Sequence, residues 1–238
     1  TLSKGRHNWP EGSYPGFASH GYGGRLWTVG GDLPCPDGGY IDFVMGLASV
    51  GLGYGYPTVS YAVGKMVRDG ASFSLPHVLE EKVAEELCAI IPCAEAVRFV
   101  KTGSEADSAA VRIARAFTGR DVILKCGYTG WHDWAVSQEE WCPGVANVGD
   151  DVAKLTYNDL AQVQRLFDVF WKGKVAAVIM EPTLIDPPAP GFLEGVRELC
   201  TRHGALLIFD EIVCGFRWAL GGGQEYFEVR PDLATFGK

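Results

Sequence analysis

The most constraining feature of this sequence is a series of short apolar segments that alternate with segments of helical character. VAAVIM (175–180) and ALLIF (205–209) are apolar at every position. A strand with one face in solvent would instead alternate apolar and polar residues. Strands that alternate with helices and are apolar on both faces are typical of a parallel sheet covered by helices on both sides. The sequence therefore predicts an α/β, doubly wound fold.

The remaining elements follow from hydrophobic spacing and from punctuation by Gly and Pro. Two expected helices end at Gly119 and Gly204, as helices often do. The first forty-odd residues are rich in Gly, Pro and aromatics and predict an N-terminal arm with short antiparallel strands over 1–45, followed by one large domain over 46–238. We expect a hairpin between 25–29 and 40–44, helices over 76–92, 104–119, 158–171 and 193–204, and strands over 96–100, 122–126, 175–180 and 205–209.

Charge and cysteine usage exclude several classes of protein. Lys and Arg number 21 against 29 Asp and Glu, which gives a net charge of −8, and no basic stripe is present. Nucleic acid and anionic membranes are therefore not expected partners. The apolar runs are too short to span a bilayer, and the first residues do not resemble a signal peptide. The seven cysteines contain no CxxC pair, so we expect no metal site, reduced thiols and a cytoplasmic protein.

The residues that follow the strands are the candidates for function, because ligands of open α/β sheets bind at the carboxyl ends of the strands. Thr102, Gly103 and Ser104 stand where a helix is expected to begin, and free backbone N–H groups there suit a phosphate. The alternative is a weak capping box formed by Ser104 and Asp107, and on its own this motif favours that alternative.

The sequence lacks motifs that two other classes of enzyme, the nucleotide hydrolases and the serine hydrolases, require. LLIFDE (206–211) is similar to the magnesium-binding strand of a nucleotide hydrolase, but no G-x-x-x-x-G-K-[ST] occurs. A serine hydrolase is excluded because no G-x-S-x-G occurs. The adjacent pair His132 and Asp133 favours a structural role, since two neighbouring residues rarely face one substrate.

Five blocks, taken in order, resemble the class III pyridoxal-phosphate-dependent aminotransferases, which have fold type I. The similarity runs from about residue 40 to residue 238 and is greatest with the glutamate-1-semialdehyde 2,1-aminomutase branch. The order and spacing of the blocks are specific, although each block alone is weak. The blocks are TGSEA (102–106), GYTGWHDW (127–134), EP (181–182), GFLEGVRELCTRHGALLIFDEIVCGFR (191–217) and PDLATFGK (231–238).

The resemblance implies a cofactor, pyridoxal 5'-phosphate, and a role for each matching residue. Lys238 would be the catalytic lysine that forms the Schiff base, and Asp210 would face the pyridine nitrogen. The other roles implied are phosphate binding by Thr102, Gly103 and Ser104, packing on the two ring faces by Tyr128 and Ile212, and a position near the phenolic oxygen for Glu181.

The resemblance also implies a small-molecule amino donor, a keto or aldehyde acceptor and a homodimer. Relatives carry a small C-terminal domain beyond the lysine, so we expect this sequence to be a partial chain that lacks it.

Two differences from relatives bear on the reaction. Val213 stands where many class III transaminases carry Gln, and the block at 181–193 is shorter than in true aminomutases and lacks their Gly-Asn pair. We therefore place amino-group transfer first and keep the 2,1-aminomutase reaction on glutamate-1-semialdehyde as the alternative. A catalytically inactive binding protein of the same fold is the alternative from another class. Retention of Asp210, Tyr128 and Lys238 favours an enzyme.

Overall fold

The computed structural model describes residues 16–31, 33–137 and 151–238. These residues form two compact units that meet in the chain between Pro76 and His77, and Lys238 is grouped with the first unit. The domain boundary predicted after residue 45 was based on composition. The two units are defined by compactness instead, so the predicted boundary stays a prediction.

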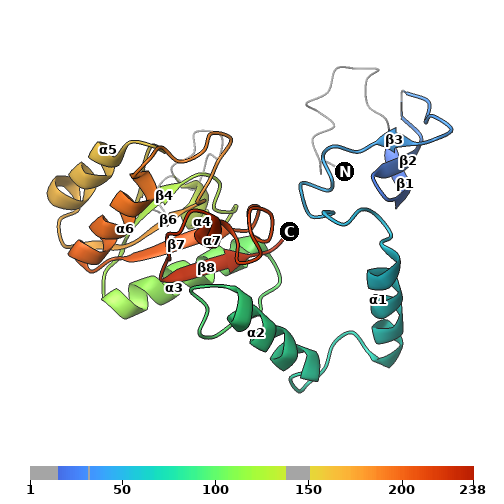
Figure 1. Ribbon diagram of the computed structural model, residues 1–238, viewed down its shortest axis with the longest axis horizontal. Coiled ribbons are helices and arrows are strands. Elements are labelled where there is room, and N and C mark those ends of the chain that lie inside the picture. The colour runs from blue at the N-terminus through green and yellow to red at the C-terminus, as the bar shows by residue number, and fades with distance from the viewer. Residues whose placement is uncertain (1–15, 32, 138–150) are drawn as a thin grey trace. The chain divides into compact units, whose positions relative to one another are not determined.

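The first unit contains a three-stranded antiparallel sheet and one helix (Figure 1). Strands β1 (Phe17–Tyr22), β2 (Arg25–Val29) and β3 (Tyr40–Ile41) lie in that order, with β2 paired to both neighbours. The predicted hairpin is confirmed, since β2 and β3 pair antiparallel. Its first strand has the predicted bounds 25–29, whereas its second strand covers only the first two residues of the predicted segment 40–44. Strand β1 lies within the arm that was predicted to hold short antiparallel strands, although its bounds were not predicted. Helix α1 (Pro57–Asp69) was not predicted. Strand β1 contains Gly, Ser and His, which are weak strand signals.

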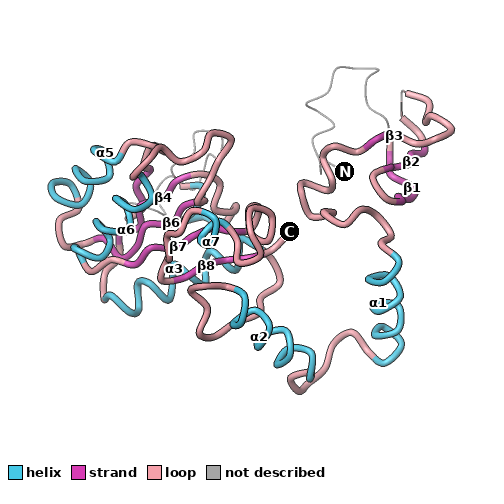
Figure 2. Tube along the Cα trace, viewed as in Figure 1, coloured by secondary structure: helices cyan, strands magenta, loops and turns pink. Residues whose placement is uncertain are grey.

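The second unit is built on a five-stranded parallel sheet with the strand order β5-β4-β6-β7-β8. Figure 2 shows β4, β6, β7 and β8 of this sheet together with its helices. Every neighbouring pair is parallel, which confirms the α/β prediction. Parallel neighbours require crossover connections, and helices supply them here. The strands are β4 (Val122–Cys126), β5 (Val152–Lys154), β6 (Val175–Met180), β7 (Leu206–Glu211) and β8 (Leu233–Phe236).

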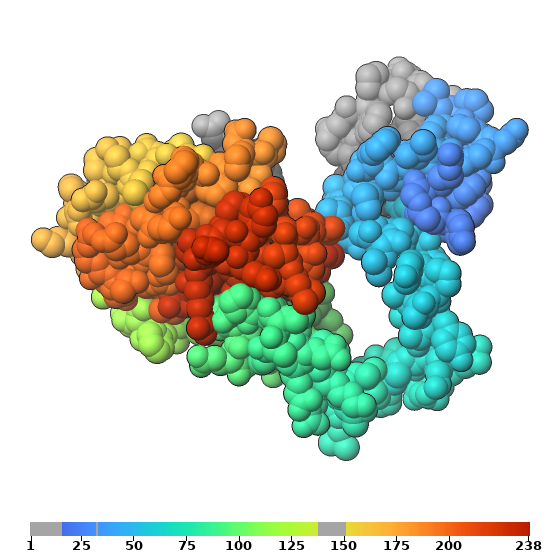
Figure 3. Space-filling view, in the orientation of Figure 1, coloured from blue at the N-terminus to red at the C-terminus, as the bar shows by residue number. Residues whose placement is uncertain are grey.

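Helices cover both faces of this sheet, because the central strands are apolar on both sides. In β6, Val178 and Met180 pack in one hydrophobic cluster with α6 (Phe192–His203), whereas Ala177 and Ile179 pack in the other with α3 (Gly103–Thr118). Helix α5 (Leu160–Arg165) lies beside α6, and their side chains form a continuous surface in Figure 3. The doubly wound arrangement is therefore confirmed.

Two predicted elements differ from the structure. Residues 96–100 form no strand, since no described strand pairs with them, and Phe99 remains 42% exposed. A strand forms only where a neighbour satisfies its backbone groups. The predicted helix 158–171 is α5 followed by a π-helical turn over Leu166–Phe170.

Helix α2 (Val78–Ile90) lies close to its predicted bounds, and two further helices of this unit are short. Helix α2 begins after His77, whose side chain caps it. Helices α4 (Asp133–Val136) and α7 (Gly223–Tyr226) each span four residues. Within the described ranges, no helix combines the length and the apolar character needed to cross a membrane.

Candidate active site at the carboxyl ends of the strands

Helix α3 begins with a capping box formed by Thr102 and Glu105. The backbone N–H of Glu105 donates to Thr102 Oγ1 at 3.2 Å, and the N–H of Thr102 donates to Glu105 Oε2 at 3.1 Å. The capping box expected from Ser104 and Asp107 is therefore wrong, because the cap lies two residues earlier. This leaves the Ser104 hydroxyl and the Asp107 carboxyl for other contacts.

The first turn of α3 offers donors to an anion. Among the described residues, the N–H groups of Gly103 and Ser104 have no backbone or side-chain acceptor. They stand at the positive end of a 16-residue helix, the environment that favours a phosphate. Ser104 Oγ accepts a hydrogen bond of 3.3 Å from the N–H of Trp131. A Cβ at Gly130, whose φ is +95°, would lie 2.6 Å from that oxygen, so the loop after β4 packs on this turn only with glycine at that position.

Ile212 links this turn to the chain that leads into Lys238. A Cβ added at Gly103 would lie 3.1 Å from Ile212 Cδ1, and a Cβ added at Gly237 would lie equally close. The isoleucine side chain therefore occupies the space left by two glycines that are distant in sequence. Gly237 directly precedes Lys238, the predicted catalytic lysine.

Asp210 lies in a buried acidic cluster at the end of β7. It is 3% exposed and Asp107, on α3, is 1% exposed. Thr235 on β8 is the register partner of Asp210, and its Oγ1 donates a hydrogen bond of 2.7 Å to Asp107 Oδ1. The N–H of Ile212 donates to Asp210 Oδ1 at 3.0 Å. Three elements thus place two carboxyl groups and a hydroxyl together, away from water.

Burial raises the pKa of Asp107 to about 9. The charge of Asp210 and a side-chain hydrogen bond with that residue act in the same direction, as does the charge of Glu181, while the hydrogen bond from Thr235 opposes them. Two adjacent carboxyl groups in a buried site do not both ionise readily. The pair therefore holds a proton at neutral pH.

Glu181 and Tyr128 follow neighbouring strands. Glu181 is the first residue after β6, and a Cβ added at Gly127 would lie 3.0 Å from its Oε1. Gly127, with φ of +81°, follows β4 and permits this close approach. Tyr128 comes next and is 60% exposed, so its ring is available to cover a flat ligand.

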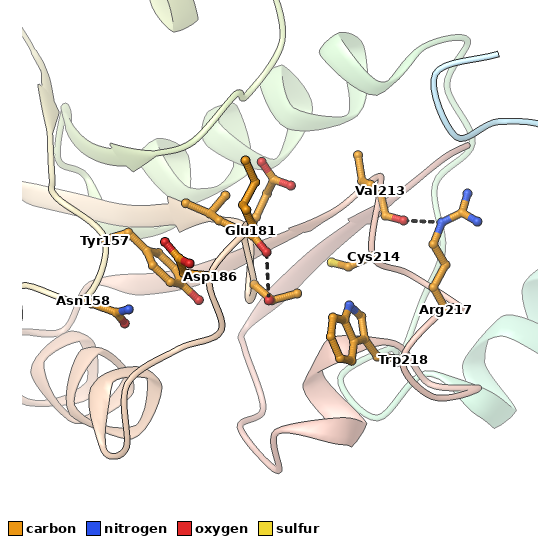
Figure 4. Close-up of a pocket in the computed structure, with 11 residues that line it drawn as sticks. Tyr157, Asn158, Glu181, Asp186, Val213, Cys214, Arg217 and Trp218 are labelled. Carbon is orange, nitrogen blue, oxygen red and sulfur yellow. Dashed lines mark hydrogen bonds between the residues drawn. The ribbon is translucent and has the colours of Figure 1, made fainter. Parts of the chain in front are cut away.

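A pocket of about 690 Å³ opens beside Glu181 (Figure 4). Tyr157 and Asn158 lie on one side of it, with Arg217 and Trp218 on the other. Its volume is in the range of small-molecule sites. The sequence did not predict Tyr157, Asn158 or Trp218 as part of a site.

The sequence also missed four residues that shape the candidate active site. The sequence could have identified Asp107 as a site residue, because it lies four residues after Gly103 and so on the same face of the helix. Thr235 had a weaker one, since it lies in the last of the five blocks. The four residues are Asp107, Gly127, Gly130 and Thr235.

Comparison with known proteins gives consistent matches over nearly the whole chain. The sequence pattern of the family described as Aminotransferase class-III matches residues 18–238. A curated relative, 3-aminobutyryl-CoA aminotransferase from Cloacimonas acidaminovorans (strain Evry), is 38% identical and is matched over 98% of this chain and 56% of its own length.

Two solved structures extend the comparison. One, described as a transaminase with PLP bound, has a TM-score of 0.85 at 28% identity, over 95% of this chain and 55% of that chain. A glutamate-1-semialdehyde aminomutase from Pseudomonas aeruginosa PAO1 has a TM-score of 0.79 at 26% identity, over 94% of this chain and 50% of that one. The chain thus spans about half the length of the relatives it matches.

Proposed function

The chain belongs to the class-III aminotransferases, and from that premise we propose that the whole protein is a pyridoxal-phosphate-dependent aminotransferase. One observation carries the proposal. Four residues converge at the carboxyl edge of the sheet, namely Asp210, Ile212, Gly103 and Gly237. The last of them directly precedes Lys238, the lysine expected from the family pattern. The cofactor proposed is pyridoxal 5'-phosphate, and the solved transaminase with PLP bound supports that choice.

The described residues suit the phosphate and the ring of this cofactor. The N–H groups of Gly103 and Ser104 and the hydroxyls of Thr102 and Ser104 would serve the phosphate. Ile212 would pack on one ring face and Tyr128 on the other. When bound, pyridoxal phosphate supplies an electron sink for the electrons of a broken C–H bond.

Asp210 and Lys238 have the chemical roles. The Asp210 carboxylate would pair with the ring nitrogen and keep it protonated, because an opposite charge favours the charged form. Lys238 would bind the cofactor covalently through Nζ and then, once released by substrate, move the α-proton as a general acid–base. Glu181 would lie near the phenolic oxygen.

For substrates, we propose a small-molecule amino donor and a keto or aldehyde acceptor. The curated relative is named for 3-aminobutyryl-CoA, which favours amino-group transfer. The aminomutase reaction is the second candidate, favoured by the likeness to the solved aminomutase. We place amino-group transfer first because the chain is 38% identical to the curated aminotransferase and 26% identical to the solved aminomutase.

We further propose a homodimer in the cytoplasm. The six cysteines among the described residues are all free, which is typical of a reducing compartment. Many large apolar side chains of the first unit are exposed, among them Phe43 at 90% and Tyr61 at 76%, and an interface would bury such surface. Sedimentation of the active protein tests the dimer, and an active monomer would contradict it.

One experiment tests the function. The full chain is incubated with pyridoxal phosphate and each amino donor, with and without a keto acid, and both products are quantified. Transfer predicts equal amounts of keto product and new amine, only when an acceptor is present. Isomerisation without acceptor would instead support the aminomutase. Failure to bind cofactor at all would contradict both.

A further inference from the structure

The strongest unassigned feature is the carboxyl pair of Asp107 and Asp210. Both side chains are almost fully buried, at 1% and 3% exposed. Thr235 donates to Asp107 Oδ1 at 2.7 Å and is the register partner of Asp210, so the two carboxyl groups lie on either side of one hydroxyl. A hydrogen bond between two carboxyl groups requires a proton on one of them. Asp107 belongs to α3 and Asp210 to β7, so the contact is made only by tertiary packing.

The surroundings favour the proton on Asp107. The titratable groups that act on it are Asp210 from β7 and Glu181 after β6, and both are acidic. One of its oxygens accepts from the Thr235 hydroxyl, which leaves the rest of the carboxyl group for the contact with Asp210. Asp210 in turn accepts from the N–H of Ile212, a bond that stabilises a carboxylate.

We propose that Asp107 is a positioning residue that, in its protonated form, donates a hydrogen bond to Asp210. The donated bond orients Asp210 and leaves the negative charge of the pair on the residue that faces the ring nitrogen. This inference rests on the proposed function, because it concerns how Asp210 is presented to the cofactor.

Two substitutions separate this role from simple packing. Asp107→Asn keeps both hydrogen bonds, since an amide N–H₂ can donate to Asp210 while its oxygen accepts from Thr235. Asp107→Leu has a similar size but offers neither bond. Asp69→Asn is the matched control, because Asp69 is exposed at the end of α1.

The first readout is infrared spectroscopy of the cofactor-free protein at neutral pH. We expect the carbonyl stretch of a protonated carboxylic acid in the unmodified protein and in Asp69→Asn, and its loss in Asp107→Asn. Absence of the band from the unmodified protein, or its persistence in Asp107→Asn, would overturn the assignment of the proton.

The second readout is the dissociation constant of pyridoxal phosphate, measured by equilibrium dialysis. Asp107→Asn should bind within about threefold of the unmodified protein, and Asp107→Leu about tenfold or more weakly, the value of one charge-assisted hydrogen bond. An affinity within about threefold of the unmodified protein in both variants would reduce Asp107 to a packing residue. Equal weakening in both would show that an amide donor does not replace the acid, and would contradict the positioning role. If the unmodified protein binds no cofactor, the proposed function and the positioning role both fail, while the infrared band still decides the protonation.

Discussion

Thr235 donates a hydrogen bond of 2.7 Å to Asp107, although 128 residues separate them in the sequence. The bond connects β8 to α3 beside Asp210, the register partner of Thr235 and the residue proposed to pair with the ring nitrogen. Its two partners are buried, so water cannot replace either one if the other is removed. The stability of the fold and the geometry of Asp210 are therefore expected to change together when this contact is altered.

Replacement of Thr235 by valine should destabilise the protein and shift the titration of Asp107. The change removes the hydroxyl but keeps the shape, and leaves a buried acceptor without its donor, at a cost of about 1–3 kcal/mol. Because this bond lowers the pKa of Asp107, its loss should raise that pKa further. Urea unfolding and infrared titration measure the two effects. Thr235→Ser should behave as the unmodified protein, and an unchanged titration in Thr235→Val would contradict the prediction.

The stability of the protein should fall relative to Asp107→Asn as the pH rises. The pKa of Asp107 is raised from its ordinary value of 3.8 to about 9 in the folded protein, so the folded state keeps a proton that the unfolded state loses between those values. The contribution to stability is complete below the ordinary pKa and is lost as the pH rises through the folded pKa.

Thermal unfolding of both proteins from about pH 5 to about pH 9 measures this difference. The difference between the Tm of Asp107→Asn and the Tm of the unmodified protein should increase in favour of the variant as the pH rises through this range. A constant difference would show that Asp107 titrates normally.

Gly103→Ala should weaken cofactor binding through Ile212. Alanine suits the first position of a helix, but its Cβ would lie 3.1 Å from Ile212 Cδ1 and would displace the side chain proposed to pack on the ring. Overpacking of this kind costs about 1–3 kcal/mol. Ile212→Val, which removes Cδ1, should restore part of the binding in the double variant.

The control for this prediction is Gly64→Ala, because a Cβ at Gly64 in α1 meets nothing within 4 Å. It should leave cofactor affinity unchanged and add about 1 kcal/mol of stability from helix propensity. Equal affinities for Gly103→Ala and the unmodified protein would disprove the role of the contact with Ile212.

Lys238→Ala should abolish covalent attachment of the cofactor while leaving non-covalent binding. In the full chain, borohydride reduction followed by peptide mapping should find the cofactor on Lys238. Turnover of the variant should fall by several orders of magnitude, since nucleophile and proton carrier are lost together. Lys174→Ala, at an exposed position before β6, is the control. A reduced adduct on Lys101 or Lys125 would refute the assignment.

Local sequence was sufficient for the sheet and most of its helices. The uninterrupted apolar segments of β6 and β7 require burial on both faces, and this is a property of the residues themselves. Helix ends at Gly119 and Gly204 are equally local, because both glycines adopt left-handed backbone angles there. The five blocks in succession were sufficient for the family, a prediction that the family match over residues 18–238 confirms.

Only the tertiary structure decided which residues meet at the edge of the sheet. Residues 96–100 have the composition of a strand but no described partner, because pairing depends on a neighbour that local sequence does not specify. The contact of Asp107 with Thr235, and the position of Ile212 between Gly103 and Gly237, join segments more than a hundred residues apart or on different elements. The burial that raises the pKa of Asp107 arises from this packing, so the sequence identified Asp210 but not the carboxyl group beside it.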